Sequence, residues 1–339
     1  MPDFNTKSYD VVALGNAIVD ILGTCDDTFI EECGMTKGVM QLLFSEDEAS
    51  ALYQKMPASQ ETSGGSAANT IAVISSLGGK TGFMGKVSDD QLGHIFAHDI
   101  KASGTDFTTP VYQGDISTAR CMILVTPDAE RTMNTYLGSS VEFNPEDIDS
   151  DMISKSRILY LEGYLYDKPK AKQAFDKAAK VAQEAGCEVA LTLSDPFCVD
   201  RHRDDFVKII TERVDILFAN EDEVKALYPE MTLEDALAEL SKTVEIVAMT
   251  VGAKGSLILN DGKRYEVPAV STKVVDTTGA GDSYAGGFLY GYTQNKDLSV
   301  CGAYGSACAG AVISTIGARY SGDLNDVVST SVAKEQKSA

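Results

Sequence analysis

The chain is short of positive charge. Its 339 residues include 29 lysines and arginines against 50 aspartates and glutamates, which gives a formal net charge of −21 at pH 7. A uniformly acidic surface repels nucleic acid and anionic lipid. The composition therefore argues against nucleic acid and membranes as partners and leaves small molecules as the expected ligands.

Histidine is scarce as well, with three residues in the whole chain. His94 and His98 are spaced by one helical turn, but no third ligand is evident near them. A solvated helix face is therefore the expected role of this pair, and a metal site is not. With so few histidines, a histidine general base is not expected either.

The sequence also lacks the signals of export. Residues 1–7 do not have the charged and then apolar layout of a secretory signal, and the most membrane-like stretch, Cys301–Ala318, is rich in Gly, Ser and Ala. That composition predicts a tightly packed buried helix instead. The seven cysteines form no C-x-x-C pair and lie in apolar segments, which suits reduced thiols. We expect a cytoplasmic protein.

Two common nucleotide-binding motifs are missing. No G-x-G-x-x-G follows the first predicted strand, Tyr9–Gly15, which weakens a dinucleotide interpretation. Gly78-Gly-Lys-Thr81 looks like the end of a P-loop, but the position that needs the first glycine is Ile74, and a strand-like segment follows. A P-loop is therefore rejected.

What the chain does have is a regular alternation of apolar strands and helices. Strands are predicted at 157–162, 188–193, 215–219 and 245–251, with helices at 167–185, 206–213 and 221–228 between them. Asp167 is expected to cap the first of these helices, and Gly186 to end it. Strands that are apolar throughout indicate a mostly parallel α/β sheet with helices on both faces.

Two regions break this alternation. Thr24–Phe44 and Thr105–Leu137 alternate as β-strands without full helices, which predicts a small β-sheet lid. With no internal repeat or linker, we expect one domain over residues 1–330. Its lid segments are inserted at about 16–50 and 105–137. A final polar helix is expected after about Asn325, and a polar C-terminal tail covers 331–339.

The segment Asp276-Thr-Thr-Gly-Ala-Gly-Asp282 predicts an anion-binding loop. Gly279, Ala280 and Gly281 allow backbone N–H groups to converge just before an apolar helix, Ser283–Gln294. A helix N-terminus adds unsatisfied donors and partial positive charge. Asp282 suits such a place if it accepts a proton from a hydroxyl that attacks a phosphate, which indicates a phosphotransferase. The alternative is that Asp282 simply caps the helix.

Other polar groups follow strands or precede helices. Gly64, Gly65 and Asn69 precede the helix Thr70–Leu77 and suit a polyhydroxylated ligand, or else form a tight turn. Asn16 and Asp20 leave the first strand at its carboxyl end, where open α/β sheets bind ligands; a turn or cap is the plainer role.

Two further loops follow predicted strands. Asn220 and Glu223 are placed to hold hydrated Mg²⁺ with nucleotide phosphates, unless the acids merely favour a helix N-terminus. Thr250, Gly252 and Gly255 lie in a loop that suits a nucleotide, or in a Gly-rich hairpin.

Together these motifs resemble the ribokinase-type (PfkB) family of carbohydrate and nucleoside kinases. The resemblance rests on Gly64–Gly79, on Asp276–Ser283 followed by Ala285-Gly-Gly-Phe288, and on Asn220-x-x-Glu223, and it spans Gly15 to about Gly322. Within the family the chain is most similar to adenosine kinases. That likeness is carried by Gly15-Asn16-x-x-x-Asp20-Ile21, Leu193-Ser-Asp-Pro-Phe197 and Val214–Glu221.

The resemblance implies roles for these residues. Asp282 is the general base; Gly279, Ala280 and Gly281 bind the transferring phosphoryl group; and Arg131 clamps phosphate from the lid. The ribose is bound by Asn16, Asp20, Gly64, Gly65 and Asn69, and the adenine pocket holds Phe197, with Tyr164 where relatives place an aromatic against the base. Asn220 and Glu223 order Mg²⁺ through water, Thr250, Gly252 and Gly255 contact ATP, and Asp276 with the Thr278 carbonyl matches a monovalent-cation site.

The expected activity is ATP- and Mg²⁺-dependent phosphorylation of the 5′-hydroxyl of adenosine, with K⁺ as an optional activator. Two alternatives stay open. One is a kinase of a sugar or of another nucleoside on the same scaffold, and the other is a non-catalytic sensor that kept the fold. Intact Asp282, Asn220 and Glu223 speak against the sensor. The pattern does not decide between a monomer and a homodimer.

Overall fold

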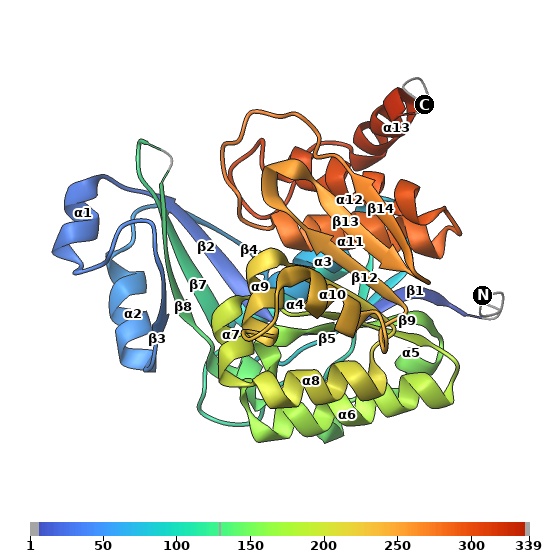
Figure 1. The fold of residues 1–339 in the computed structure, drawn as a ribbon. Coiled ribbons are helices and arrows are strands. Elements are labelled where there is room, and N and C mark those ends of the chain that lie inside the picture. Colours follow the sequence, from blue (N-terminus) through green and yellow to red (C-terminus); the bar gives the residue numbers. More distant parts are fainter. Residues whose placement is uncertain (1–6, 129, 336–339) are drawn as a thin grey trace.

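The computed structural model of the protein describes residues 7–128 and 130–335. Within those ranges the strands form a large sheet in the body of the molecule and a small sheet that projects from its edge (Figure 1). The predicted class, a mostly parallel α/β sheet with a small β-sheet lid, is confirmed.

The large sheet has nine strands in the described part of the chain, in the order β14-β13-β12-β11-β10-β9-β1-β5-β6. Their bounds are β1 (Tyr9–Leu14), β5 (Thr81–Met84), β6 (Thr105–Phe107), β9 (Ser156–Glu162), β10 (Glu188–Thr192), β11 (Ile216–Asn220), β12 (Ile246–Thr250), β13 (Ser256–Asn260) and β14 (Lys263–Val267). Neighbours from β12 to β6 are parallel, whereas β13 and β14 add an antiparallel edge.

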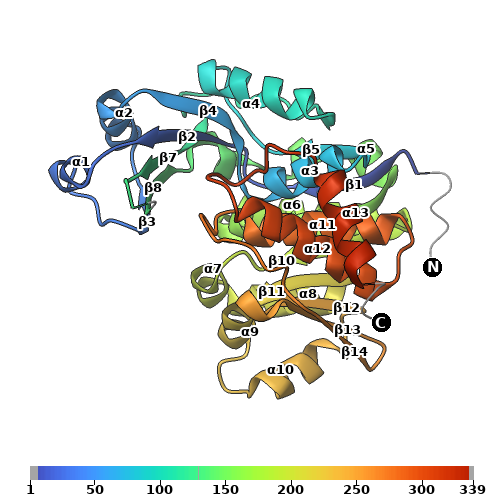
Figure 2. The ribbon, with the colours of Figure 1, turned by 90° about the horizontal axis from the view of Figure 1, so that it is seen from above.

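Helices bury both faces of this sheet. One face is covered by α5 (Ser150–Ser154), α6 (Pro169–Glu184), α7 (Pro196–Arg201), α8 (Arg203–Arg213), α9 (Glu221–Leu227) and α10 (Leu233–Leu240). The other is covered by α3 (Ser66–Ser76), α4 (Gln91–Ala102), α11 (Ala280–Thr293) and α12 (Leu298–Val312), and α13 (Leu324–Glu335) packs on α3 and α12. Figures 1 and 2 show the two layers.

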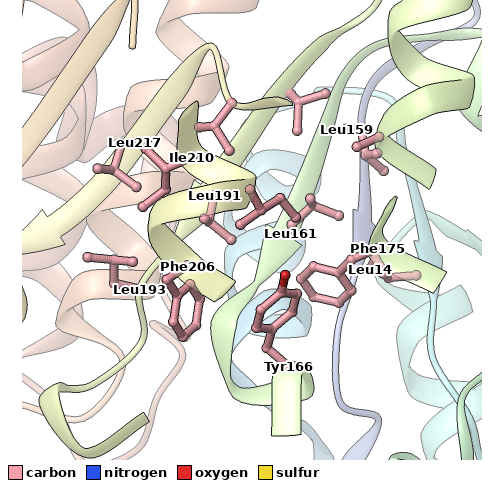
Figure 3. Packing of buried hydrophobic residues seen from close by; sticks show 14 of the residues in the cluster. Leu14, Leu159, Leu161, Tyr166, Phe175, Leu191, Leu193, Phe206, Ile210 and Leu217 are labelled. Atoms are coloured by element: carbon pink, nitrogen blue, oxygen red, sulfur yellow. The ribbon is translucent and has the colours of Figure 1, made fainter. Parts of the chain in front are cut away.

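The period of two along each strand explains the two cores. In β1, Val12 and Leu14 enter the cluster under α6 and α8, whereas Val11 and Ala13 enter the cluster under α3 and α11. Figure 3 shows the first cluster, where Phe175 and Phe206 pack on either side of Tyr166. Because both faces are buried, the strands carry few polar residues except at their ends, and those ends position the site.

The small sheet has the order β3-β8-β7-β2-β4 in the described residues. It consists of β2 (Ile18–Thr24), β3 (Met40–Leu43), β4 (Ser59–Gly64), β7 (Ala119–Val125) and β8 (Arg131–Tyr136), with the short helices α1 (Asp27–Glu32) and α2 (Glu46–Lys55) beside it. The predicted lid segments thus contain four of the five strands. They miss β4, and the segment at 105 begins with β6, which belongs to the large sheet.

Two local predictions need correction. The N-cap position of α6 is occupied by Lys168 and not by Asp167, because the turn Gly163–Asp167 precedes it. The helix predicted at Cys301–Ala318 ends at Val312, and a loop follows. The final polar helix predicted after about Asn325 is observed as α13, which spans Leu324–Glu335; the rest of the predicted tail, 336–339, lies outside the described residues. Over the described residues, no helix combines the length and apolarity needed to cross a membrane.

A buried carboxyl group at the amino end of β10 makes the free energy of unfolding depend on pH. Burial raises the pKa of Glu188, the first residue of β10, to about 7, while Tyr292 donates a hydrogen bond of 2.9 Å to its Oε1 and Oε2 has no partner. A carboxyl whose pKa is higher in the folded state stabilises most when protonated, so stability falls as pH rises from about 4.5 to about 7.

We therefore expect Glu188→Gln to leave stability near that of the wild type at pH 5 and to raise it by roughly 1–3 kcal/mol at pH 8. Urea unfolding at both pH values measures this. Glu230→Gln, at an exposed carboxylate in the turn after α9, removes the same charge and should show no such gain. Equal gains in the two variants would contradict the burial argument.

Candidate active site

One cavity of about 820 Å³ lies where the parallel strands end and the small sheet overhangs them. Asn16 follows β1, Glu162 ends β9, Asn220 ends β11 and Thr250 ends β12. Most predicted site residues line this cavity: Asn16, Asp20, Gly65, Asn69, Tyr164, Phe197, Asn220, Glu223, Thr250, Thr278, Gly279, Ala280, Gly281 and Asp282. Segments far apart in sequence thus meet at one site.

Five predicted residues are not among those that line the cavity: Gly64, Arg131, Gly252, Gly255 and Asp276. Gly252 and Gly255 shape the turn between β12 and β13 with φ angles of 58° and 106°. Arg131 and Asp276 contact each other at the edge of the site, as described below. Gly64 lies behind Asp20 and makes room for it.

Asp282 lies in the first turn of α11 and is fixed by two side chains of α3. Ser66 Oγ donates a hydrogen bond of 2.6 Å to Asp282 Oδ1, and Asn69 Nδ2 donates one of 3.2 Å to Oδ2. Burial raises the pKa of Asp282, and the Ser66 and Asn69 donors and the Arg319 charge oppose that rise. The result is an oriented carboxylate with a strengthened affinity for a proton.

The loop before Asp282 presents its backbone to the same cavity. Gly279 is the N-cap of α11 with φ of 72°, and a Cβ there would lie 2.6 Å from the Ala318 carbonyl oxygen, so glycine is required. The Ala280 N–H donates to the Thr277 carbonyl at 3.2 Å. That N–H is therefore already engaged, and the predicted three-residue anion site rests mainly on Gly279 and Gly281.

The Gly64-Gly65 pair, at the end of β4 and the N-cap of α3, lets Asp20 of β2 and the Asn16 backbone approach closely. A Cβ on Gly64 would lie 2.3 Å from the Asp20 carboxyl, and one on Gly65, whose φ is 97°, would lie 2.4 Å from the Asn16 carbonyl oxygen. Side chains at either position would displace the residues predicted to bind hydroxyl groups. The glycines act by leaving space and not through contacts of their own.

Asn16 is oriented by Glu162, a buried residue that the sequence analysis did not select. Glu162 accepts hydrogen bonds from the Asn16 N–H (3.1 Å), Asn16 Nδ2 (2.8 Å) and the Ala67 N–H (2.8 Å). Asn16 Oδ1 has no partner and is left as a hydrogen-bond acceptor. Burial raises the pKa of Glu162 to about 7. The sequence feature that could have identified Glu162 is its position as an acidic residue at the carboxyl end of an apolar strand.

Asp20 enters the cavity from β2. Burial raises its pKa to about 6, which Arg319 and Arg131 oppose and Asp282 reinforces. Together with Asn16 Oδ1, its carboxylate offers acceptors that match neighbouring hydroxyl donors. Asp20 and Asn16 therefore line one cavity, and their role in binding hydroxyl groups stays a prediction.

Asn220 and Glu223 form a capping box at the start of α9. Asn220 Nδ2 donates to Glu223 Oε1 at 2.6 Å, the Asn220 N–H donates to Oε2 at 2.9 Å, and the Glu223 N–H donates to Asn220 Oδ1 at 2.9 Å. Burial raises the pKa of Glu223 to about 7. The pair therefore has the plainer structural role that the sequence allowed, and it also lines the cavity.

This donor set fits Mg²⁺ only as an outer shell. No group of three or more His, Cys, Asp or Glu in the described residues is placed to hold a metal ion directly. Mg²⁺ prefers to keep several waters and to bind nucleotide phosphates. One buried carboxylate beside the cavity fits contact through such waters.

Asp276 is already neutralised by the protein. Its Oδ1 accepts from the Thr278 N–H at 3.0 Å, and its Oδ2 accepts from the Gly317 N–H at 2.8 Å and lies 2.5 Å from Arg131 Nη1. The Arg131 contact is an ion pair without hydrogen-bond alignment. A monovalent cation at Asp276 would have to displace this guanidinium, so the residues present do not fit the predicted cation site. The role of Arg131 as a phosphate clamp stays a prediction.

Aromatic side chains stand at the mouth of the cavity. Phe197 at the start of α7 is 76% exposed, and Phe44, which follows β3, is 87% exposed. Tyr164 is fixed by Ser194, which accepts from the Tyr164 N–H at 3.1 Å through Oγ and from its hydroxyl at 3.2 Å through the backbone oxygen. Phe44 was not predicted, because only the lid fold brings it opposite the strand ends.

Known proteins resemble this chain over almost its full length. A structure of adenosine kinase from Sinorhizobium meliloti is 47% identical with a TM-score of 0.86, and one of a probable sugar kinase from Rhizobium etli is 45% identical with a TM-score of 0.87; each alignment covers 98% of this chain and 99% of the other. The 5-dehydro-2-deoxygluconokinase of Bacillus licheniformis is 28% identical over 91% of both chains.

The family model described as pfkB family carbohydrate kinase matches residues 39–324. This range contains both glycine motifs, the Asn220–Glu223 pair and Asp282. The match therefore covers most of the chain and the greater part of the site described above, and the chain belongs to the pfkB family of carbohydrate kinases.

Proposed function

We propose that the protein transfers a phosphoryl group from ATP to the 5′-hydroxyl of adenosine, giving AMP and ADP. Members of the pfkB family use ATP as phosphate donor, so the proposal concerns the acceptor. The observation that carries it is the oriented carboxylate of Asp282 beside the Gly279–Gly281 backbone in one cavity with Asn16 and Asp20. The 47% identity to an adenosine kinase over 98% of the chain favours a nucleoside.

The chemistry requires a base that is held in place. Asp282 takes the proton of the acceptor hydroxyl as its oxygen bonds to the γ-phosphorus, and the bond from that phosphorus to the β–γ bridging oxygen breaks to release ADP. Ser66 and Asn69 hold the carboxylate, so little reorganisation is needed during transfer. Positioning supplies much of the rate in such reactions.

The anionic phosphates need local positive potential in a protein of net charge −21. The Gly279 and Gly281 backbone and the N-terminus of α11 provide it at the transferring group. Mg²⁺, when bound with the nucleotide, neutralises phosphate charge, and Glu223 would hold it through water. Closure of the small sheet over the cavity would exclude water that competes as acceptor.

The mouth of the cavity suits a flat apolar group. Phe44 from the lid side and Phe197 from the body are exposed beside the Tyr164 ring, and burying such faces on a base is favourable. The polar floor of the cavity, formed by Asn16 and Asp20, suits a ribose. A purine nucleoside satisfies both parts, whereas a sugar satisfies the floor alone.

A sugar acceptor is the second candidate. The relative from B. licheniformis is a 5-dehydro-2-deoxygluconokinase, and the R. etli structure is described as a probable sugar kinase. The floor residues Asn16 and Asp20 would bind sugar hydroxyl groups equally well. A protein that binds ligand without turnover is the remaining alternative.

An acceptor panel separates these functions. We expect ADP release from ATP·Mg²⁺ with micromolar adenosine, weaker release with inosine and guanosine, and little with ribose, fructose or 5-dehydro-2-deoxygluconate. Because Arg131 already pairs with Asp276, we expect K⁺ to change the rate little. Turnover with sugars alone would overturn the nucleoside proposal while keeping the mechanism. Binding without turnover, seen as a thermal shift, would favour the sensor.

A further inference from the structure

Arg319 is a charged residue at the back of the site that no motif singled out. It follows α12 in the loop that also supplies Gly317, whose N–H binds Asp276, and Ala318, which packs on Gly279. Its guanidinium is directed toward the Gly64-Gly65 turn. Nε donates to Asn69 Oδ1 at 3.0 Å, and Nη1 donates to Ser63 Oγ at 3.0 Å.

These two bonds span the turn from one side to the other. Ser63 lies in β4 just before the glycines, and Asn69 lies in α3 just after them. Arg319 therefore fixes the ends of the segment on which Asp20 and the Asn16 backbone rest. A residue of similar length without N–H donors, such as methionine, would leave both contacts unmade.

The bond to Asn69 also decides which way its amide points. An amide side chain has one acceptor and one donor end. With Oδ1 held by the Arg319 Nε–H, Nδ2 faces Asp282 and donates at 3.2 Å to Oδ2. If the amide turned over, two acceptors would face each other at Asp282, and the carboxylate would lose one of its two bonds from α3.

We propose that Arg319 is a positioning residue for phosphoryl transfer, which acts through Asn69 to orient the carboxylate of Asp282. The proposal rests on the role of Asp282 as the base and does not depend on whether the acceptor is adenosine or a sugar.

The charge of Arg319 supports the same role. Burial lowers its pKa, and Asp20, Asp99 and Asp282 oppose that change. Arg319 in turn lowers the pKa of Asp20 and of Asp282. The titratable and charged groups that face these two carboxylates from the surrounding elements are Cys121, Arg131, Tyr160, Glu162, Tyr164, Arg319 and the two carboxylates themselves. Removal of Arg319 should therefore move the acidic limb of the rate profile to higher pH.

A double-mutant cycle tests the proposal in the full-length protein. We expect Arg319→Met to lower kcat about 10- to 100-fold, and to cause less than about a threefold further loss in the Asn69→Ala background, because the two residues act as one unit. Arg264→Met removes an exposed arginine of β14 and should leave kcat unchanged. Circular dichroism and thermal unfolding check that each variant is folded.

Arg319→Lys provides the second readout. Lysine keeps the charge but not the two-pronged contact, so the pH profile should stay near that of the wild type while kcat is only partly restored. The positioning role would be overturned if Arg319→Met lowered kcat as much in the Asn69→Ala background as in the wild type. A folded Arg319→Met variant with wild-type kcat would overturn it as well. If Asp282→Asn itself kept full activity, the base assignment would fall instead, so the two failures are distinguishable.

Discussion

Asp282→Asn is expected to lower kcat by roughly 10²–10⁴-fold while the dissociation constant of the acceptor changes little. Asparagine has nearly the same shape and still accepts from Ser66 Oγ, so the pocket keeps its shape, although the new amide NH₂ faces Asn69 Nδ2 and that bond is lost. What it loses is the site that takes the proton. Single-turnover kinetics with adenosine and ATP·Mg²⁺, alongside calorimetric binding of adenosine, measure the two quantities separately.

The matched control is Asp235→Asn. Asp235 is an exposed carboxylate in the first turn of α10, where it accepts from Thr232 Oγ1, so the substitution makes the same chemical change at another helix start. We expect wild-type turnover from this variant. An Asp282→Asn enzyme with turnover within a few fold of the wild type would remove Asp282 from the role of base and would leave it a structural residue that joins α11 to Ser66 and Asn69 of α3; it is not the helix cap, because Gly279 occupies the N-cap position.

The large sheet and its helices could be predicted from the sequence because each strand and each helix has its own hydrophobic pattern, and the patterns alternate along the chain. Buried parallel strands leave continuous apolar runs, and β9 to β12 with α6 and α9 between them were predicted within a few residues. The lid was harder. Strand β4, Ser-Gln-Glu-Thr-Ser-Gly, is polar and pairs with β2 at the edge of the small sheet, so it carries no hydrophobic pattern.

The residues of the candidate site also divide into those that the sequence predicted and those that it did not. Motif residues such as Asp282, Asn69 and Asp20 were predicted because glycines and chain position mark them. Glu162 and Arg319 were not, because each acts through another side chain and only the fold brings it there. Arg319 was further hidden by the expectation of a helix to Ala318, which ends at Val312 where the loop back to the site begins.

Arg131 shows where a resemblance alone is insufficient. Its predicted place in the lid is confirmed by β8, but its guanidinium pairs with Asp276 at the edge of the site. Two residues assigned to different roles, phosphate binding and cation binding, thus neutralise each other. Spacing along the chain does not reveal such a pair, because 145 residues separate them.

Asp20→Ala should raise the KM for adenosine about 10²-fold or more, with a smaller change in kcat and none in the KM for ATP. A carboxylate that accepts two hydroxyl donors contributes about 1.5–3 kcal/mol for each charge-assisted bond, and its loss acts on acceptor binding before chemistry. Gly64→Ala should have a similar effect with Asp20 still present, because the new Cβ would lie 2.3 Å from the carboxyl. Initial-rate kinetics over both substrates measure these constants.

A comparison of substrates shows whether Asp20 binds the ribose itself. If its carboxylate accepts from the 2′- and 3′-hydroxyls, the wild type should prefer adenosine over 2′-deoxyadenosine by about 10-fold or more in kcat/KM, because the deoxy analogue leaves a buried acceptor unpaired. In Asp20→Ala that preference should nearly disappear, since no acceptor is left to lose its partner. An undiminished preference in the variant would mean that other groups, Asn16 Oδ1 first among them, bind the ribose hydroxyls and that Asp20 acts on the lid alone.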